Sequence, residues 1–129
     1  MRRHAFAATN LISDPIHGYI ELTKRLEAGE SAALGLPAEA NAEDDLLDTA
    51  WLQRLRRISQ LQSARWVFPT AEHSRFTHGL GVVHEAGLWA RSPYPSLHAT
   101  LAARGGRIPS EGLVVETPRV AGPLHDVGH

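Results

Sequence analysis

The chain has no cysteine, a single methionine and few aromatic residues, which make up 6% of its 129 positions. Without cysteine it can form neither disulfide bonds nor thiolate metal sites, so any metal ion would need nitrogen and oxygen ligands. An excess of charge is also missing, because 13 lysine and arginine residues face 14 aspartate and glutamate residues. A net charge of -1 disfavours nucleic acid as a partner, without excluding it.

Long apolar runs are absent as well. Residues 1–7 include basic side chains but no apolar stretch of the length that a signal peptide or a membrane span requires. We therefore expect a cytoplasmic protein without membrane contact. At 129 residues the chain has room for one domain at most, and we expect residues 1–129 to form part of a single domain.

The sequence predicts a mostly α fold with a short N-terminal β-hairpin at about residues 9–23. The hairpin turn is Asp14-Pro15-Ile16-His17-Gly18, in which proline fixes φ and glycine permits a positive φ. Residues 19–22 then alternate like a strand. Residues 25–45 are rich in alanine, glutamate and glycine, and they read as a loop or a weakly formed helical insertion.

Residues 48–129 form the expected helical region. A first helix is predicted at about residues 49–62 and a second at residues 74–90, whereas residues 96–107 are ambiguous. The apolar positions expected in the core of these two helices are Leu52, Leu55, Ile58 and Leu61 in the first, and Phe76, Leu80, Val83 and Leu88 in the second. The three tryptophans, Trp51, Trp66 and Trp89, are interpreted as core or interface anchors.

A last helix is predicted to begin near Ser110 or Pro118 and to include His125 and Asp126. Pro118 and Pro123 indicate that this helix is short or broken, because proline inside a helix removes a hydrogen-bond donor. Adjacent imidazole and carboxylate side chains suit a divalent transition ion. His78, on a separate helix, could complete the same site, as facing helices often do. On spacing alone, an exposed polar pair remains the alternative.

Four stretches of the chain resemble the HD-domain phosphohydrolases, most closely the branch of deoxynucleoside triphosphate (dNTP) triphosphohydrolases that includes SAM-and-HD-domain and dGTPase-like enzymes. They occur in the family's order and with nearly its spacing. The stretches are residues 14–22 (DPIHGYIEL); residues 48–61, with DT, QRLRRI and QL; residues 68–82, with FP, RF, His78 and LGV; and residues 124–129 (LHDVGH).

The resemblance implies an HD-domain helical fold that holds a divalent ion through the pattern His, His-Asp, Asp. His78, His125 and Asp126 match the first three metal ligands. The fourth ligand and the catalytic residues are expected downstream of His129, so the fold is expected to be incomplete at its C-terminus. Gln60, Arg75 and His129 match positions that contact the substrate. The ion's identity stays open among Fe, Mn, Zn, Ni and Mg, since nitrogen and oxygen ligands accept all of them.

The activity implied for a complete relative is the metal-assisted hydrolysis of a dNTP to a deoxynucleoside and triphosphate. The expected partner is a dNTP substrate, and a homo-oligomer is possible. A different class of function is a non-catalytic nucleotide-binding or oligomerisation module. Triphosphate release would indicate the enzyme, whereas stabilisation by dNTPs without turnover would indicate the module.

Overall fold

The computed structural model describes residues 9–24 and 43–129, and within them the fold is mostly α with one hairpin, as predicted. Residues 25–42, most of the predicted insertion, lie outside the described residues. By its internal contacts the chain divides into two compact units, Met1–Arg54 and Leu55–His129. The expectation of a single domain stays a prediction.

The first unit contains the hairpin. Strands β1 (Thr9–Asp14) and β2 (Gly18–Thr23) pair antiparallel, with Ile12 opposite Ile20. Gly18 has a φ of +77°, the left-handed conformation for which the turn needs a glycine. Ile20 and Leu22 point to one face, because strand side chains alternate, and both are buried.

Two short helices follow in the same unit, α2 (Glu43–Leu47) and α3 (Ala50–Gln53). The backbone N–H of Thr23 donates to the Glu43 carboxylate at 2.9 Å, and the N–H of Glu43 donates to the Thr23 hydroxyl at 3.3 Å. This reciprocal pair of hydrogen bonds ties β2 to α2.

The predicted helix at residues 49–62 is wrong in extent. After α3 the chain tightens into a 3₁₀ turn at Arg54–Arg57, and Ser59 then forms a bridge with Ser74. Leu52 and Leu55 are buried as expected, but Leu61 is 47% exposed because the helical periodicity has ended before it. Two further 3₁₀ turns, Gln62–Trp66 and Pro69–Ala71, lead to the next helix.

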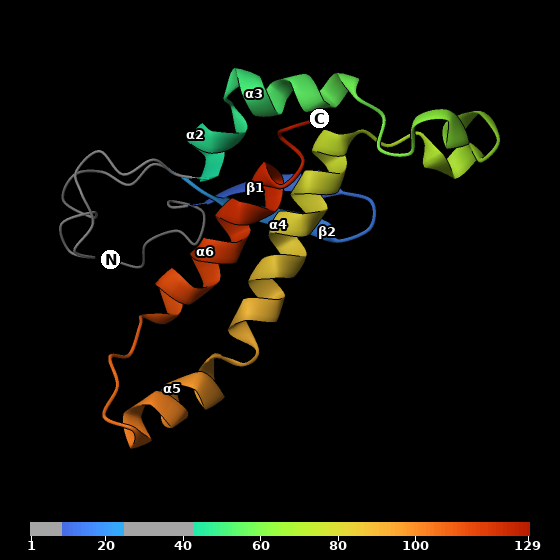
Figure 1. Cartoon of the computed structure of the whole chain (residues 1–129). Helices are drawn as coiled ribbons and strands as arrows, with labels where there is room; N and C mark the ends of the chain where they lie inside the picture. Colours follow the sequence, from blue (N-terminus) through green and yellow to red (C-terminus); the bar gives the residue numbers. More distant parts are fainter. Residues whose placement is uncertain (1–8, 25–42) are drawn as a thin grey trace. The chain divides into compact units, whose positions relative to one another are not determined.

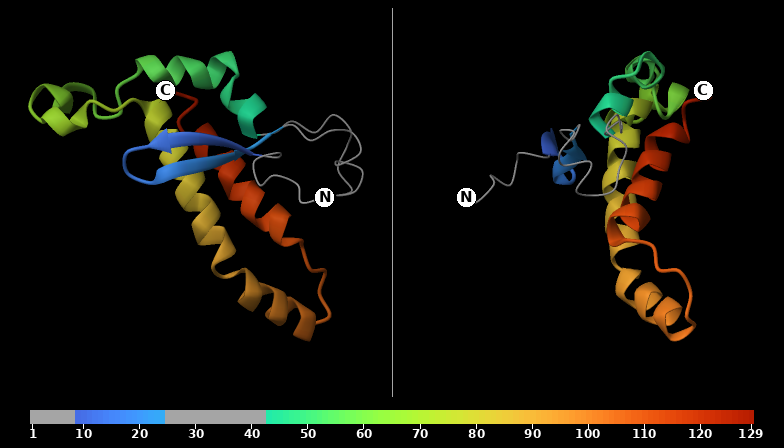
Figure 2. Two further views of the ribbon diagram at one scale, coloured as in Figure 1. Left: turned by 180° about the vertical axis from the view of Figure 1, so that it is seen from behind. Right: turned by 90° about the vertical axis from the view of Figure 1, so that its left-hand side faces the viewer.

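The second unit is built on two long helices, α4 (Arg75–Arg91) and α6 (Glu111–Leu124). Figures 1 and 2 show them side by side. Both begin at a serine, as the sequence suggested: the hydroxyls of Ser74 and Ser110 accept the N–H groups of Thr77 and Leu113. The intervening helix α5 (Tyr94–Ala103) buries none of its residues.

Glycines let α4 and α6 approach closely. A Cβ on Gly122 would lie 3.0 Å from a Val82 methyl, and one on Gly79 would lie 3.7 Å from the Cα of Pro123. Further along, Gly87 faces Arg119. These pairings run in opposite directions along the two helices, so the helices are antiparallel. The start of α4 therefore meets the end of α6.

The prolines of α6 do not break it. Pro118 and Pro123 both lie inside a continuous helix that starts at Glu111, so the expectation of a short or broken helix is wrong. Pro123 is buried, and its contact with Gly79 contributes packing that offsets the missing N–H. Leu88, expected in the core of α4, is 51% exposed. The buried apolar residues of the second unit are Leu55, Ala71, Phe76, Leu80, Val83 and Val115.

Candidate metal centre

The predicted ligands come together where the start of α4 meets the end of α6. His78 lies near the beginning of α4, and its N–H donates to the Ser74 carbonyl at 3.1 Å. The prediction that α6 includes His125 and Asp126 is wrong: α6 ends at Leu124, His125 is its C-cap, and Asp126 lies in the turn that follows. A turn can direct both neighbouring side chains to one side, which neighbouring positions on a helix do less readily.

His78, His125 and Asp126 each offer a ligand atom, and these atoms lie within 4.8 Å of one another. Within residues 9–24 and 43–129 this is the one group of three His, Asp or Glu side chains with such an arrangement. The two imidazole rings meet edge to face, with centroids 5.3 Å apart and an interplanar angle of 76°. Two nitrogens and one carboxylate oxygen form a donor set suited to a divalent transition ion.

A hydrogen bond to the backbone fixes the orientation of the His125 ring. Its Nδ1–H donates to the carbonyl of Gly122 in the last turn of α6. This bond leaves Nε2 as the free ligand atom, an arrangement common among metal-binding histidines. Gly122 thus orients a side chain of the site through its backbone carbonyl. Sequence reasoning missed this role, because any residue can supply a backbone carbonyl acceptor.

Asp126 is the buried anion of the site, only 5% exposed. Its Oδ1 lies 3.0 Å from Nη1 of Arg75, 3.5 Å from Nε2 of His125 and 3.7 Å from Nε2 of His129. Its Oδ2 is buried and finds no hydrogen-bond partner among the described residues. A buried carboxylate oxygen without a donor is unfavourable, and a cation beside His78 and His125 would satisfy it. The residues present therefore fit a metal ion.

The pKa of His78 is lowered from its usual value, first by burial and second by the nearby charge of His125. A lowered pKa means that the ring stays neutral down to a more acidic pH. Because only the neutral ring has a free lone pair, this shift keeps His78 in its ligating form.

The structure gives different surroundings to the three predicted substrate contacts. Arg75 is buried and paired with Asp126, a pairing that the sequence did not indicate. His129 is 58% exposed at its side chain, and it lies beside Asp126 because the turn after α6 brings it back. Their roles toward a substrate stay predictions.

A backbone hydrogen bond joins Gln60 to the segment just before α4. Its N–H donates to the His73 carbonyl at 3.1 Å, next to the bridge between Ser59 and Ser74. The Gln60 side-chain carbonyl oxygen is buried and has no hydrogen-bond partner among the described residues. A buried acceptor without a donor is unfavourable in a folded protein.

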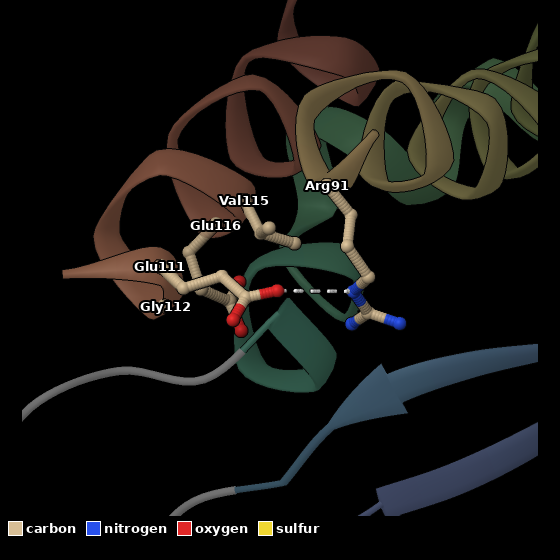
Figure 3. A pocket seen from close by; sticks show the side chains of 5 residues that line it. All are labelled: Arg91, Glu111, Gly112, Val115 and Glu116. Atoms are coloured by element: carbon tan, nitrogen blue, oxygen red, sulfur yellow. Dashed lines mark ion pairs between the residues drawn. The ribbon is translucent and has the colours of Figure 1, made fainter. Parts of the chain in front are cut away.

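A separate hollow of about 310 Å³ lies at the opposite end of the same helix pair (Figure 3). It is lined by Arg91 of α4 and by Glu111, Gly112, Val115 and Glu116 of α6. Its Arg91–Glu111 ion pair is loose, at 3.8 Å, and both side chains are more than half exposed. An exposed pair of this kind contributes little binding energy, so the chemistry of the molecule is better sought at the metal centre.

Comparison with known proteins gives several relatives, although no model of a protein family matches the chain. The human deoxynucleoside triphosphate triphosphohydrolase SAMHD1 is 35% identical over 119 residues, which cover 92% of this chain and 15% of that protein. Its homologue in Dictyostelium discoideum is 30% identical over 125 residues, covering 95% of this chain and 19% of that protein.

A putative HD domain-containing protein of Acanthamoeba polyphaga mimivirus is 30% identical over 92 residues, covering 65% of this chain and 19% of that protein. Among solved structures, a phosphohydrolase from Bacteroides thetaiotaomicron superposes with a TM-score of 0.59 at 27% identity, covering 94% of this chain and 24% of that one. The chain thus spans less than a quarter of the length of these four proteins. Sequence and fold together make the chain an HD-domain segment related to the deoxynucleoside triphosphate triphosphohydrolases.

Proposed function

We propose that this chain holds the divalent metal ion of a phosphohydrolase that converts dNTPs to deoxynucleosides and triphosphate. The observation that supports it most directly is the convergence of His78, His125 and Asp126, with ligand atoms within 4.8 Å, in a chain similar to named dNTP triphosphohydrolases. A bound divalent ion would polarise a phosphate oxygen and help to activate water.

The chain's own side chains supply the remaining interactions. His78 and His125 would hold the ion through ring nitrogens, and Asp126 would supply the compensating charge. His129, exposed beside the carboxylate, would donate to a phosphate oxygen. Gln60, tied to the segment just before α4, carries an amide that would pair with a sugar hydroxyl. Each of these contacts would stabilise charge or fix orientation around the reacting phosphorus.

Metal binding is the first test. Titrating the chain with Mn²⁺ in a calorimeter should show one site, and Asp126→Asn and His78→Ala should each weaken it by more than about tenfold, since even outer-shell partners of a metal typically contribute 10–100-fold. His98→Ala is the matched control, because His98 lies on α5 outside the ligand group and contacts Tyr94. Equal binding by all the variants would rule out this ligand set.

Turnover is the second test. The chain is incubated with each of the four dNTPs and Mn²⁺, and the products are separated by ion-pair chromatography. Release of triphosphate and deoxynucleoside that is lost in Asp126→Asn supports the proposal. Because the catalytic residues are expected downstream of His129, the same assay is run on the full-length protein. Metal binding and stabilisation by dNTPs without release of triphosphate by the full-length protein would contradict the catalytic part and indicate a nucleotide-binding module instead.

A further inference from the structure

The two oxygens of the Asp126 carboxylate have different surroundings. Oδ1 lies 3.0 Å from Nη1 of Arg75, whereas Oδ2 is buried and has no hydrogen-bond partner among the described residues. The imidazoles of His125 and His129 lie farther from Oδ1, with their Nε2 atoms at 3.5 and 3.7 Å. Arg75 is therefore the nearest of these partners of one oxygen, and the other oxygen is left for a metal ion.

The ion pair that engages Oδ1 is buried. The side chains of Arg75 and Asp126 are only 9% and 8% exposed, so water screens neither group well. Arginine stays protonated in proteins, and breaking the pair would leave its buried guanidinium without an anion. The pair should therefore persist when the second oxygen binds an ion, as carboxylates that ligate metals commonly keep such an outer hydrogen-bond partner.

A carboxylate with one oxygen engaged in this way offers a metal ion only the other oxygen. We propose that Arg75 confines Asp126 to ligation through Oδ2 alone, and that it thereby sets which divalent ion the metal centre prefers. This inference rests on the proposed function, since it presupposes the metal centre. Arg75 acts on the ion through Asp126, so its role is that of a positioning residue.

The preferred ion follows from the donor set. His78, His125 and one oxygen of Asp126 supply two nitrogens and one oxygen. Imidazole ligands favour Zn²⁺, which needs few ligands, whereas Mn²⁺ favours carboxylate oxygens and a larger number of ligands. Freeing Oδ1 would add a second oxygen to the set. That addition benefits Mn²⁺ more than Zn²⁺, so Arg75 shifts the preference of the centre toward zinc.

The test is the ratio of the Zn²⁺ and Mn²⁺ affinities of the 129-residue chain. Zn²⁺ is titrated into the Mn²⁺-loaded chain, and the released Mn²⁺ is followed by electron paramagnetic resonance. Both ions carry two charges, so the loss of the arginine charge affects both alike and cancels in the ratio. In Arg75→Met, which cannot donate to Oδ1, the ratio should fall at least about tenfold, the lower end of what outer partners contribute to metal affinity. Arg75→Lys keeps a donor and the charge, and it should restore most of the ratio.

Arg91→Met is the matched control, since Arg91 lies on the same helix in an exposed ion pair, and its ratio should equal that of the unmodified chain. An unchanged ratio in Arg75→Met would overturn the inference and leave the metal centre in place. No binding of either ion by the unmodified chain would overturn the metal centre itself, and the proposed function with it.

A second measurement needs no variant, so it decides the question even if Arg75→Met does not fold. The infrared difference spectrum between the metal-free and the Zn²⁺-bound chain reports the carboxylate that binds the ion. The antisymmetric and symmetric stretches of a carboxylate lie far apart when one oxygen binds a metal, and closer together when both oxygens do. We expect the wide separation. The narrow separation would place Oδ1 on the ion and overturn the role of Arg75.

Discussion

At the scale of the residue, Gly122 has two roles. Its missing side chain admits Val82 of α4, and its carbonyl accepts Nδ1–H of His125. A Cβ at this position would meet the Val82 methyl at 3.0 Å and the α4 backbone at 3.5 Å. The tight contact is the one with the Val82 methyl, which would have to shift by a few tenths of an ångström, whereas the contact with the backbone is ordinary. The packing of α4 on α6 and the orientation of His125, a proposed metal ligand, therefore depend on the same small residue.

We expect Gly122→Ala to lower the free energy of unfolding by about 1–3 kcal/mol, as overpacking of a close contact does. Urea denaturation followed by circular dichroism measures it. The matched control is Gly112→Ala on the same helix, where a Cβ meets nothing within 4 Å. Because alanine is the better helix former, that variant should gain up to about 1 kcal/mol. Changes of the same sign in both variants would contradict the close contact.

At the scale of the element, α6 depends on how it begins. Its 14 residues include two glycines and two prolines, which are poor helix formers. The Ser110 hydroxyl accepts the N–H of Leu113 at 3.3 Å and satisfies one of the free donors of the first turn. A helix with weak internal propensity gains proportionally more from such a cap, so Ser110 helps to hold the element whose far end presents His125.

Ser110→Ala should therefore destabilise the chain by about 1 kcal/mol, and Ser110→Asp should restore stability to within a few tenths, because aspartate is also a good N-cap. Thermal unfolding by circular dichroism distinguishes the two. A Ser110→Asp variant as unstable as Ser110→Ala would show that the hydroxyl acts through something other than the cap.

At the scale of the whole molecule, the tryptophans lie on the surface. Trp51, Trp66 and Trp89 are 69%, 78% and 77% exposed, so the expectation that they pack in the core is wrong, while the interface alternative stays a prediction. Single exposed apolar side chains are common on protein surfaces, and only a contiguous patch of them indicates a surface that contacts something else. None of the helices in the described part of the chain combines the length and the apolar composition of a membrane span.

If the indoles face water in the isolated chain, acrylamide should quench their fluorescence almost equally before and after unfolding in urea. The comparison is made at low protein concentration and repeated at high concentration. Protection that appears only at high concentration would support self-association through these side chains. Protection at every concentration would contradict the exposed surface.

Sequence reasoning succeeded where the signal is local. The Asp14–Gly18 turn and the starts of α4 and α6 near Ser74 and Ser110 each depend on neighbouring residues, and each is confirmed. The three predicted metal ligands were proposed through motif resemblance, which supplies distant pairings that periodicity cannot; the structure brings them together, and their binding of a metal stays a prediction.

Sequence reasoning failed where a contact between residues distant in sequence determines the local structure. The helix after Thr49 gives way to a segment in which Ser59 pairs with Ser74, and Pro123 lies buried inside α6, packed on α4 near Gly79. The pairing of Arg75 with Asp126 could not be predicted from local patterns, since it depends on the antiparallel packing of α4 and α6. Each of these outcomes belongs to tertiary packing, which a local pattern does not encode.

Because α4 and α6 are antiparallel, the contacts of the site join two parts of the chain that are far apart in sequence, as a cross-link does in a polymer. A contact between His78 and His125, or between Arg75 and Asp126, closes a loop that contains α5, and α5 buries none of its residues. Closing a loop costs an entropy that rises only slowly with its length. Insertions or deletions between residues 94 and 109 should therefore leave the ligands in register, so this loop is where the chain can diversify without losing its chemistry.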